Sequence, residues 1–389
     1  MQPALTQALE KLVFWMKDEA LPLWREHGID HQLGACYDRL LENGSPDLQA
    51  NRQMEVQAQF IYIMARSKQL GWSVGGQEIV KSMANFVSRH GTLPCRSDGY
   101  VRALDAQLNI IDSTHDLQDH AYFILSSIAT YSAFGDGSDV RRAFNIIEWL
   151  DIKHTHPEGG WDEGSYTAQI RRSRSHLQLF VAFIYLFEVT QNEFWLGRAR
   201  QLHKLFCDKL YDSNLGIVWD EYDDRWQRQT SDLSDRVSTE SLLRWSSALG
   251  RFAKATGEVT PEARTLYLSA IRLGRDPATG LFLEVVTSKG QALSKTKTCK
   301  TLSEYVRASL YLAEAGDAAA QAQVVEGINL LFQHFVSKEF PGGCFNLLGE
   351  NNLPLLHGFD VASLFALFET ALLASKVLSG KFRIPEVNE

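Results

Sequence analysis

The chain has 389 residues, a formal net charge of -8 and 45% hydrophobic residues, so it can bury a large core. An acidic balance without a dense basic block argues against a nucleic-acid-binding protein. Five scattered cysteines without a CxxC pair argue against a disulfide framework or a zinc site, and they favour free thiols in a reducing compartment. The N-terminus alternates polar and apolar residues at helical spacing, so we expect neither a signal peptide nor a membrane span there.

Twelve segments have apolar residues at i, i+3, i+4 and i+7, which is typical of amphipathic helices. They are residues 5–17, 53–70, 77–90, 117–131, 139–153, 173–190, 193–209, 238–256, 261–274, 303–315, 318–336 and 361–378. Every second helix begins near 53, 117, 173, 238, 303 or 361, so the period is 56 to 65 residues. A period of this length indicates repeated helix pairs.

The connections between several helix pairs also look alike. Residues 98–112, 216–229, 280–293 and 342–355 each combine a glycine, a short strand, a polar turn and a second short strand. Solenoid repeats are usually shorter, at roughly 33–47 residues, and lack such strand hairpins. We therefore predict an all-α fold, an (α/α)6 barrel of six helical hairpins with short β-hairpins in its loops. Residues 1–389 form a single domain in this prediction.

Four stretches resemble motifs of the N-acylglucosamine 2-epimerase family, which includes mannose isomerase-like members. They are "NRQMEVQAQFIYIMARSKQLGW", "DLQDHAYFILSSIATYSAFGD", "IRRSRSHLQLFVAF" and "SDRVSTESLLRWSSALGRFAKATG". The resemblance runs almost end to end. It implies an (α/α)6 barrel with a sugar pocket at one end. It also implies isomerisation or 2-epimerisation by proton transfer at the carbons next to the sugar carbonyl.

The same resemblance implies that histidines on inner helices transfer the proton, and several expected residues are replaced here. At positions where the family has sugar-holding residues, this chain has Gln59 in place of an arginine, Gln118 in place of a tyrosine, Arg174 in place of an asparagine and Arg244 in place of a glutamate. At positions where the family has histidines, this chain has Gln178, Ser241 and, at the third, Ala366 or a neighbouring residue. The residues that still match are Arg52, Gln57, Asp119, Arg172 and Glu304. Amides and hydroxyls cannot accept and return a proton at neutral pH, so we expect the family reaction on neutral sugars to be lost.

The arginines suggest a different ligand. Arg174 and Gln178 share a helix face, and Arg244 lies on the matching helix of the next unit. Guanidinium groups bind carboxylate, phosphate or sulfate bidentately. We expect Arg174 and Arg244 to line the cavity and bind an anionic group, and the other binding candidates are Arg52, Gln59, Gln118, Gln178 and Ser241. The alternative is a structural site, in which Glu240 or Glu304 neutralises these cations.

Six further residues are candidates for chemistry or binding. His120, His176, Glu240 and Glu304 lie on inner helices and could act as acid or base. The histidines could instead be structural, and the carboxylates could stabilise helix N-termini. The remaining two, His357 and Asp360, precede the last inner helix and could reach the barrel mouth or stay in solvent.

Three classes of function stay open at this point. The first is an enzyme of the family's broad kind acting on a sugar or sugar acid. The second is a catalytically silent binding or regulatory barrel, and the third is a lyase or hydrolase that uses the remaining carboxylates or histidines. We expect a small-molecule ligand that is a carbohydrate or anionic, and no metal, cofactor, nucleic-acid or membrane partner. We also expect a cytoplasmic monomer or homodimer.

Overall fold

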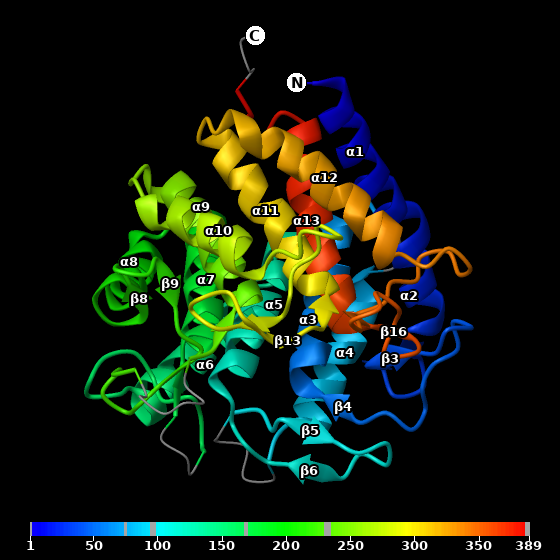
Figure 1. The fold of residues 1–389 in the computed structure, drawn as a ribbon. Helices are drawn as coiled ribbons and strands as arrows, with labels where there is room; N and C mark the ends of the chain where they lie inside the picture. The colour runs from blue at the N-terminus through cyan, green and yellow to red at the C-terminus, as the bar shows by residue number, and fades with distance from the viewer. Residues whose placement is uncertain (1, 74–75, 94–98, 167–169, 229–234, 386–389) are drawn as a thin grey trace.

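The computed structural model describes residues 2–73, 76–93, 99–166, 170–228 and 235–385 (Figure 1). The inner helices among these residues are α3 (Met54–Gln69), α5 (Leu117–Phe134), α7 (Ser173–Thr190), α9 (Thr239–Thr256), α11 (Cys299–Glu314) and α13 (Val361–Leu378). Each packs against the next, and α13 packs against α3, so the ring closes. This closure confirms the predicted barrel and its inner helices.

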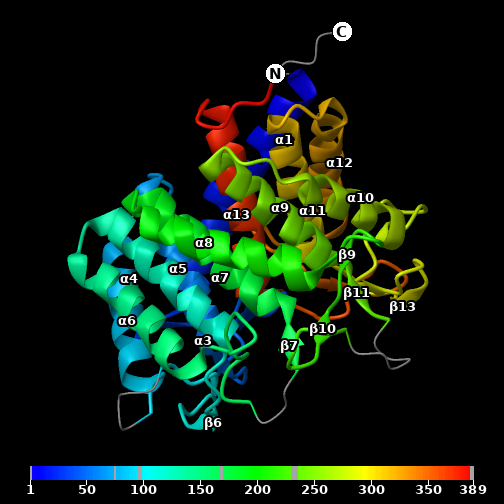
Figure 2. The same cartoon turned by 90° about the vertical axis from the view of Figure 1, so that its left-hand side faces the viewer.

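An outer helix covers each inner one within the described residues. These outer helices are α1 (Pro3–Phe14), α4 (Gly76–His90), α6 (Gly137–His154), α8 (Glu193–Leu205), α10 (Pro261–Gly274) and α12 (Ala318–His334). The first outer helix, α1, packs against the last inner helix, α13, so the two ends of the chain complete one helix pair. Figure 2, turned by 90°, shows α8 beside α7 and α12 beside α11.

The first and fourth outer helices are each followed by a π-helical turn. The first turn is η1 (Trp15–Ala20), which leads into α2 (Leu21–His27), and the second is η2 (Phe206–Leu210) after α8. The first predicted helix, 5–17, is therefore too short. Pro22 has no N–H, and it is tolerated here because it lies in the first turn of α2.

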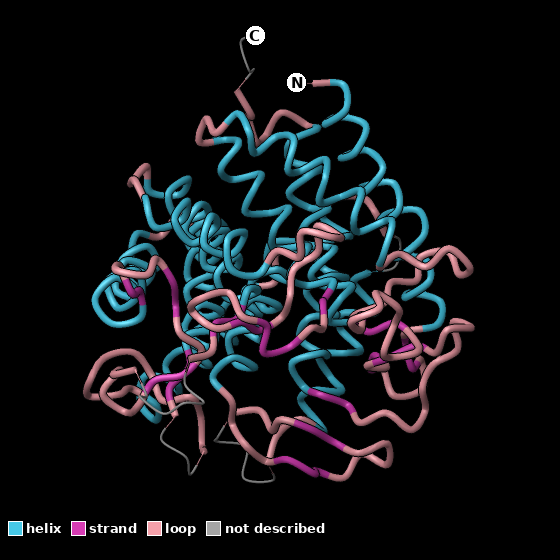
Figure 3. The backbone as a smooth tube through the Cα atoms, viewed as in Figure 1, coloured by secondary structure: helices cyan, strands magenta, loops and turns pink. Residues whose placement is uncertain are grey.

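Short antiparallel strands tie neighbouring units together, and they lie in the centre and lower half of Figure 3. The pairs are β1 (Ile29–Asp30) with β2 (Ala35–Cys36), β3 (Arg39–Leu40) with β16 (Phe359–Asp360), β7 (Arg171–Arg172) with β10 (Glu221–Tyr222), β8 (Tyr211–Asp212) with β9 (Ile217–Val218), and β14 (Lys297–Thr298) with β15 (Leu347–Leu348). Two three-stranded sheets join β4 (Arg52–Gln53), β5 (Ala103–Leu104) and β6 (Ile110–Asp112), and β11 (Val237–Ser238), β12 (Val285–Val286) and β13 (Ala292–Ser294).

The predicted hairpins form in all four connections, but two of them close through a single bridge. β5 pairs with β6 and β12 pairs with β13, as predicted for 98–112 and 280–293. Within 216–229, Tyr222 bridges Arg228, and within 342–355, Leu348 bridges Pro354. The named strands of these two connections also pair outside them: β9 with β8, β10 with β7 and β15 with β14. The strands are two or three residues long, so their partners come from tertiary contacts that local sequence does not encode.

Four of the inner helices, α5, α9, α11 and α13, begin at side-chain caps, and this sets where their site residues lie. The carboxylate of Asp116 accepts hydrogen bonds from the backbone N–H groups of Gln118 and Asp119 at the start of α5. Thr298 caps α11 in the same way, so this helix begins at Cys299 rather than at Ser303, the predicted start. Of the described helices, α13 is the one long and apolar enough to cross a membrane, and it is mostly buried inside the ring.

Candidate active site

A cavity of about 490 Å³ lies at the N-terminal ends of the inner helices. The second residue of every inner helix lines it, and these residues are Glu55, Gln118, Arg174, Glu240, Lys300 and Ala362. Residues four positions further on form a second layer of Gln59, Tyr122, Gln178, Arg244, Glu304 and Ala366, which also lines the cavity. Spacings of four and then three residues keep a side chain on one helix face, so each helix presents one stripe to the barrel axis.

The third layer along the same stripes closes the inner end of the cavity. It consists of Leu125, Val181, Ser247, Arg307 and Glu369. Across the described lining, nine carboxyl groups and six cationic side chains face the cavity, and none of the lining residues is a histidine. A cavity of this size fits a sugar-sized ligand, and its lining can make many polar contacts with one.

Arg244 lines the cavity as predicted, but its charge is already matched by protein groups. Its guanidinium lies 3.4 Å from the Glu304 carboxylate and 3.9 Å from that of Glu240, and it donates a hydrogen bond to Gln178 Oε1. Glu304 also accepts from Ser247 Oγ at 3.0 Å and pairs with Arg307. The expectation that Arg244 binds an anion is therefore corrected: Glu304 and Glu240 neutralise it, so its contacts are structural.

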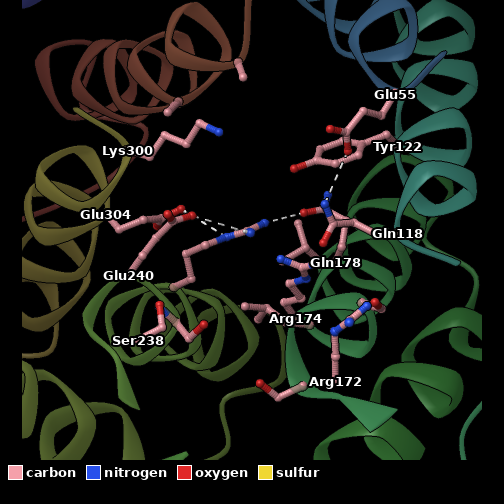
Figure 4. A pocket seen from close by; sticks show the side chains of 18 of the residues that line it. Glu55, Gln118, Tyr122, Arg172, Arg174, Gln178, Ser238, Glu240, Lys300 and Glu304 are labelled. Atoms are coloured by element: carbon pink, nitrogen blue, oxygen red, sulfur yellow. Dashed lines mark hydrogen bonds and ion pairs between the residues drawn. The ribbon is translucent and has the colours of Figure 1, made fainter. Parts of the chain in front are cut away.

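Two other cations lack such partners. Arg174 is exposed in the cavity wall, and neither it nor the half-buried Lys300 makes a hydrogen bond or ion pair with the described residues. Figure 4 shows the Lys300 side chain extending into the open space between the helices. Burial lowers the pKa of Lys300, but Glu240, Asp360 and Glu55 outweigh this and raise it, so the ammonium stays charged. These two groups are free to meet a ligand.

One buried carboxyl group of the cavity wall, that of Asp119, has a raised pKa. Burial, followed by the negative charges of Glu55 and Asp116, raises the pKa of Asp119 well above its usual range. Glu55 and Gln118 lie across the cavity from Glu240 and Glu304, and Gln118 Nε2 donates to Glu55 at 3.3 Å (Figure 4). The raised pKa favours the protonated form of Asp119, and this form can donate a hydrogen bond or a proton to a ligand oxygen.

Further polar groups in the lining are without protein partners. The side-chain oxygens of Gln59 and Gln118, and Oδ2 of Asp119, are buried and make no hydrogen bond within the described structure. Buried polar atoms are nearly always hydrogen-bonded in folded proteins. A ligand with several hydroxyl groups would satisfy these atoms, and a sugar has that chemistry.

His120 and His176 do not line the cavity, and their predicted acid–base role is corrected here. Each lies two positions after Gln118 or Arg174, the cavity-lining second residue of its helix. Two residues of helix rotate the side chain by about 200°, so it points away from the barrel axis. Both rings are 0% exposed, and each accepts a hydrogen bond at Nε2 from a backbone N–H, that of Tyr100 or of Trp161. Burial lowers the pKa of His120 to about 4 and that of His176 to about 3, so both are neutral structural residues.

Three predicted binding residues also lie outside the cavity lining. Arg52 pairs with Asp30 at 2.8 Å and donates to the carbonyl of Cys36. His357 is exposed and lies 2.9 Å from Glu42, and Asp360 caps α13 through the N–H of Ser363 at 2.7 Å. Their roles are corrected to structural or surface ones, because each is held by a partner away from the axis.

The remaining predicted residues do line the cavity. They are Gln59, Gln118, Arg174, Gln178, Glu240, Ser241, Arg244 and Glu304. Arg172, one of the residues that match the family, lines the cavity mouth with its Nε 3.6 Å from Glu221. Arg171 is buried and its guanidinium lies over the Trp226 ring at 4.2 Å, so it is not solvated.

The sequence prediction missed the roles of Glu55, Asp119, Tyr122, Lys300 and Arg307. The sequence could have indicated all of them except Asp119, because each occupies the same position along its inner helix as a predicted site residue, or a position in the same stripe, on another inner helix. Lys300 escaped because the helix was predicted to begin at Ser303. No group of three or more His, Cys, Asp or Glu side chains among the described residues is placed to hold a metal ion.

The ring of helix pairs with a polar cavity at one end defines the chain as an (α/α)6-barrel protein. A sequence model described as N-acylglucosamine 2-epimerase matches residues 35–359. Because this match spans most of the chain, the protein belongs to the N-acylglucosamine 2-epimerase family. A mannose-6-phosphate isomerase of Rhizobium meliloti (strain 1021) is 24% identical over 333 residues, which cover 80% of this chain and 85% of that relative.

Solved structures support the same fold. A D-mannose isomerase superposes with a TM-score of 0.85 at 19% identity, covering 97% of this chain and 100% of the other. A cellobiose 2-epimerase from Spirochaeta thermophila superposes with a TM-score of 0.84 at 15% identity, covering 97% and 99%. A GH76 alpha-mannanase of Bacteroides thetaiotaomicron reaches 0.69 at 12% identity, covering 95% and 97%. At these identities the likeness shows the fold and leaves the chemistry to the site.

Proposed function

We propose that the protein binds an anionic carbohydrate in this cavity and moves a proton on it with carboxyl groups. The observation that carries the proposal is the pair of cations, Arg174 and Lys300, which line the cavity and form no hydrogen bond or ion pair with the described residues. A charged group in such a site is stabilised by an opposite charge, and a ligand phosphate or carboxylate would supply it.

The charge balance of the cavity has to be reconciled with an anionic ligand, because carboxyl groups outnumber cations there. Four of the nine carboxyl groups form ion pairs with arginines of the lining: Glu240 and Glu304 with Arg244, Glu369 with Arg307, and Glu221 with Arg172. Carboxylates surround Lys300, so an anionic group would have to bind directly to Lys300 and Arg174. The matched relative, named a mannose-6-phosphate isomerase, makes a hexose phosphate the first ligand to test.

The proposed chemistry is proton transfer next to the sugar carbonyl. Glu240 lines the cavity with only a 3.9 Å contact to Arg244, so its carboxylate can take the proton from the sugar carbon. Protonated Asp119 can donate to the carbonyl oxygen, which stabilises the enediol, and the side chains of Gln59 and Gln118 would hold sugar hydroxyls. In isomerisation the carbon proton returns to the neighbouring carbon, and the hydroxyl of the first carbon gives its proton back to Asp119 as the new carbonyl forms. In epimerisation the carbon proton returns to the other face of the same carbon, and the original carbonyl oxygen gives its proton back to Asp119.

Calorimetric titration with mannose 6-phosphate, gluconate and mannose tests the proposal. We expect wild-type protein to bind the phosphate or the acid more tightly than mannose, and Arg174→Gln and Lys300→Gln each to weaken that binding about tenfold, as expected for loss of a charge-assisted hydrogen bond. Arg228→Gln, outside the lining residues, is the matched control. Equal affinity for mannose and mannose 6-phosphate, unaffected by either change, would show the proposal to be wrong.

A glycoside hydrolase is the second candidate, because carboxyl groups occupy two facing walls of the cavity (Figure 4). Two carboxyl groups that flank a glycosidic bond are what such a reaction needs. Release of a reducing sugar from an oligosaccharide by wild-type protein, and its loss in Glu240→Gln, would favour this candidate over isomerisation. We place either activity in the cytoplasm, on the strength of the scattered cysteines.

A further inference from the structure

The axial stripes continue past the sugar cavity to the other end of the barrel. The next two layers contain Arg66, Tyr185, Arg251, Tyr311 and Leu373, then Gln69, Ser132, Glu188, Lys254 and Lys376. A second cavity of about 620 Å³ lies there, at the C-terminal ends of the inner helices, and residues of all six line it. We call it the distal cavity.

Two buried donors that line the distal cavity lack partners. Arg66 is 8% exposed, and its Nε makes no hydrogen bond within the described structure. The Tyr185 side chain is 3% exposed, and its hydroxyl also has no hydrogen-bond partner there. The Arg66 guanidinium lies over the Tyr185 ring at 5.3 Å, so the two unsatisfied donors are neighbours. Leaving buried donors unsatisfied costs stability, which a bound acceptor would restore.

The distal cavity also carries an excess of positive charge. Its lining has four cations, Arg66, Lys254, Lys376 and Lys381, and one carboxylate, Glu188. That carboxylate is held by Arg251 through two hydrogen bonds of 2.8 and 2.6 Å. Of the four cations, only Lys254 forms an ion pair with a described carboxylate, that of Glu314. Arg66, Lys376 and Lys381 therefore form no ion pair with a described carboxylate, although Arg66 donates a hydrogen bond to Gln69 Oε1.

Helix dipoles explain part of this arrangement. The C-terminal ends of helices carry partial negative charge, and they favour nearby Lys and Arg by about 0.3–1 kcal/mol each. This effect accounts for cations near the ends of α3, α9 and α13. It does not account for a cavity lined by Arg66 and Tyr185 with donors left unsatisfied. Burial lowers the pKa of Lys376, and the opposing effects of Glu188 and of Arg251 and Arg66 do not reverse this.

We propose that the distal cavity is a second binding site, which takes a small phosphate-type oxyanion. Arg66 Nε and the Tyr185 hydroxyl donate to its oxygens, and Lys376 supplies the compensating charge. The site is separate from the sugar cavity and does not depend on the function proposed for it. Its donors come from α3, α7 and α13, so a bound anion would also hold together helix ends that are far apart in the sequence.

The test is titration of the whole protein with inorganic phosphate at constant ionic strength set with chloride. Arg174→Gln serves as the background, because it weakens the anion site proposed in the sugar cavity. In this background we expect the distal site to be the tighter phosphate site, and we expect Lys376→Gln or Arg66→Gln to weaken it at least about tenfold, since each removes a charged donor. Lys209→Gln on the exposed surface is the matched control and should leave phosphate affinity unchanged.

Each outcome decides the proposal separately from the proposed function. Phosphate binding that survives Arg174→Gln and is lost in Lys376→Gln supports the distal site, whatever the sugar cavity does. No phosphate site in the Arg174→Gln background, or a site equally strong in Lys376→Gln and Lys209→Gln, would overturn it. If Arg66→Gln does not fold, Lys376→Gln alone decides, because the half-buried Lys376 makes no described ion pair whose loss would unfold the chain.

Discussion

Replacing Arg244 by glutamine should destabilise the free protein, whereas replacing Arg174 should leave its stability almost unchanged. The Arg244 side chain is 18% exposed, and its positive charge pairs with the carboxylates of Glu304 and Glu240. Removing one partner of a buried ion pair costs about 3–5 kcal/mol. The lower end applies to Arg244→Gln, because Glu304 keeps its pair with Arg307. Arg174 is exposed and makes no described ion pair, so Arg174→Gln should change the unfolding free energy by no more than about 0.5 kcal/mol.

Those free energies convert into melting temperatures. An unfolding entropy of about 2.1 cal/mol/K per residue gives roughly 0.8 kcal/mol/K for 389 residues. Arg244→Gln should therefore lower the melting temperature by about 4 °C, and Arg174→Gln by less than about 1 °C. Differential scanning calorimetry of both variants without ligand, then with mannose 6-phosphate, measures this. A loss in Arg174→Gln as large as that in Arg244→Gln would mean that Arg174 has a structural partner, and the assignment of free and matched cations would be wrong.

Three further predictions concern titration and turnover. His120 and His176 have pKa values of about 4 and 3 in the folded protein, below the unfolded value of about 6.5. The unfolded state therefore binds more protons, and wild-type stability should fall as pH drops from about 6.5 toward 4. Urea unfolding of His176→Gln should show a smaller loss of stability over this pH range, and an unchanged loss would contradict the buried neutral histidine. The pKa of Asp119 is raised on folding, so its contribution to stability is present below about pH 4 and is lost as pH rises, and Asp119→Asn should flatten that alkaline decline in the same assay. Glu240→Gln should lower turnover of an active sugar by about 10²–10⁴-fold with ligand affinity nearly unchanged, and a variant that keeps its turnover would remove Glu240 as the base.

The fold could be read from the sequence because its signals repeat. Eleven of the twelve predicted helices begin within about three residues of their observed starts, and helical periodicity over ten or more residues is a strong local signal. Ring closure followed from the repeat period. The strand partners did not follow, because strands of two or three residues carry almost no periodicity and pair with segments far along the chain.

The site could be predicted only in part, because the sequence does not show which inner-helix side chains point into the cavity. Whether a side chain of an inner helix reaches the barrel axis depends on its position along the helix. That position cannot be assigned when the predicted start of the helix is wrong by a few residues. Lys300 was lost in this way. His120 and His176 were chosen for their chemistry, but two residues of helical rotation point them between the inner and outer helices. The pairing of Arg244 with Glu304 joins two helices, and no sequence pattern encodes that contact.

The most direct test of the central claim is proton exchange on mannose 6-phosphate and on mannose in D₂O, followed by proton NMR. The claim is that carboxyl groups move a proton on an anionic sugar. It predicts deuterium incorporation or product formation with mannose 6-phosphate, none above background with mannose or N-acetylmannosamine, and loss of the signal in Glu240→Gln. Turnover of neutral mannose at roughly 1–10³ per second would contradict the claim. Equally, no exchange on any anionic sugar that the protein binds would show that the cavity binds without catalysing proton transfer.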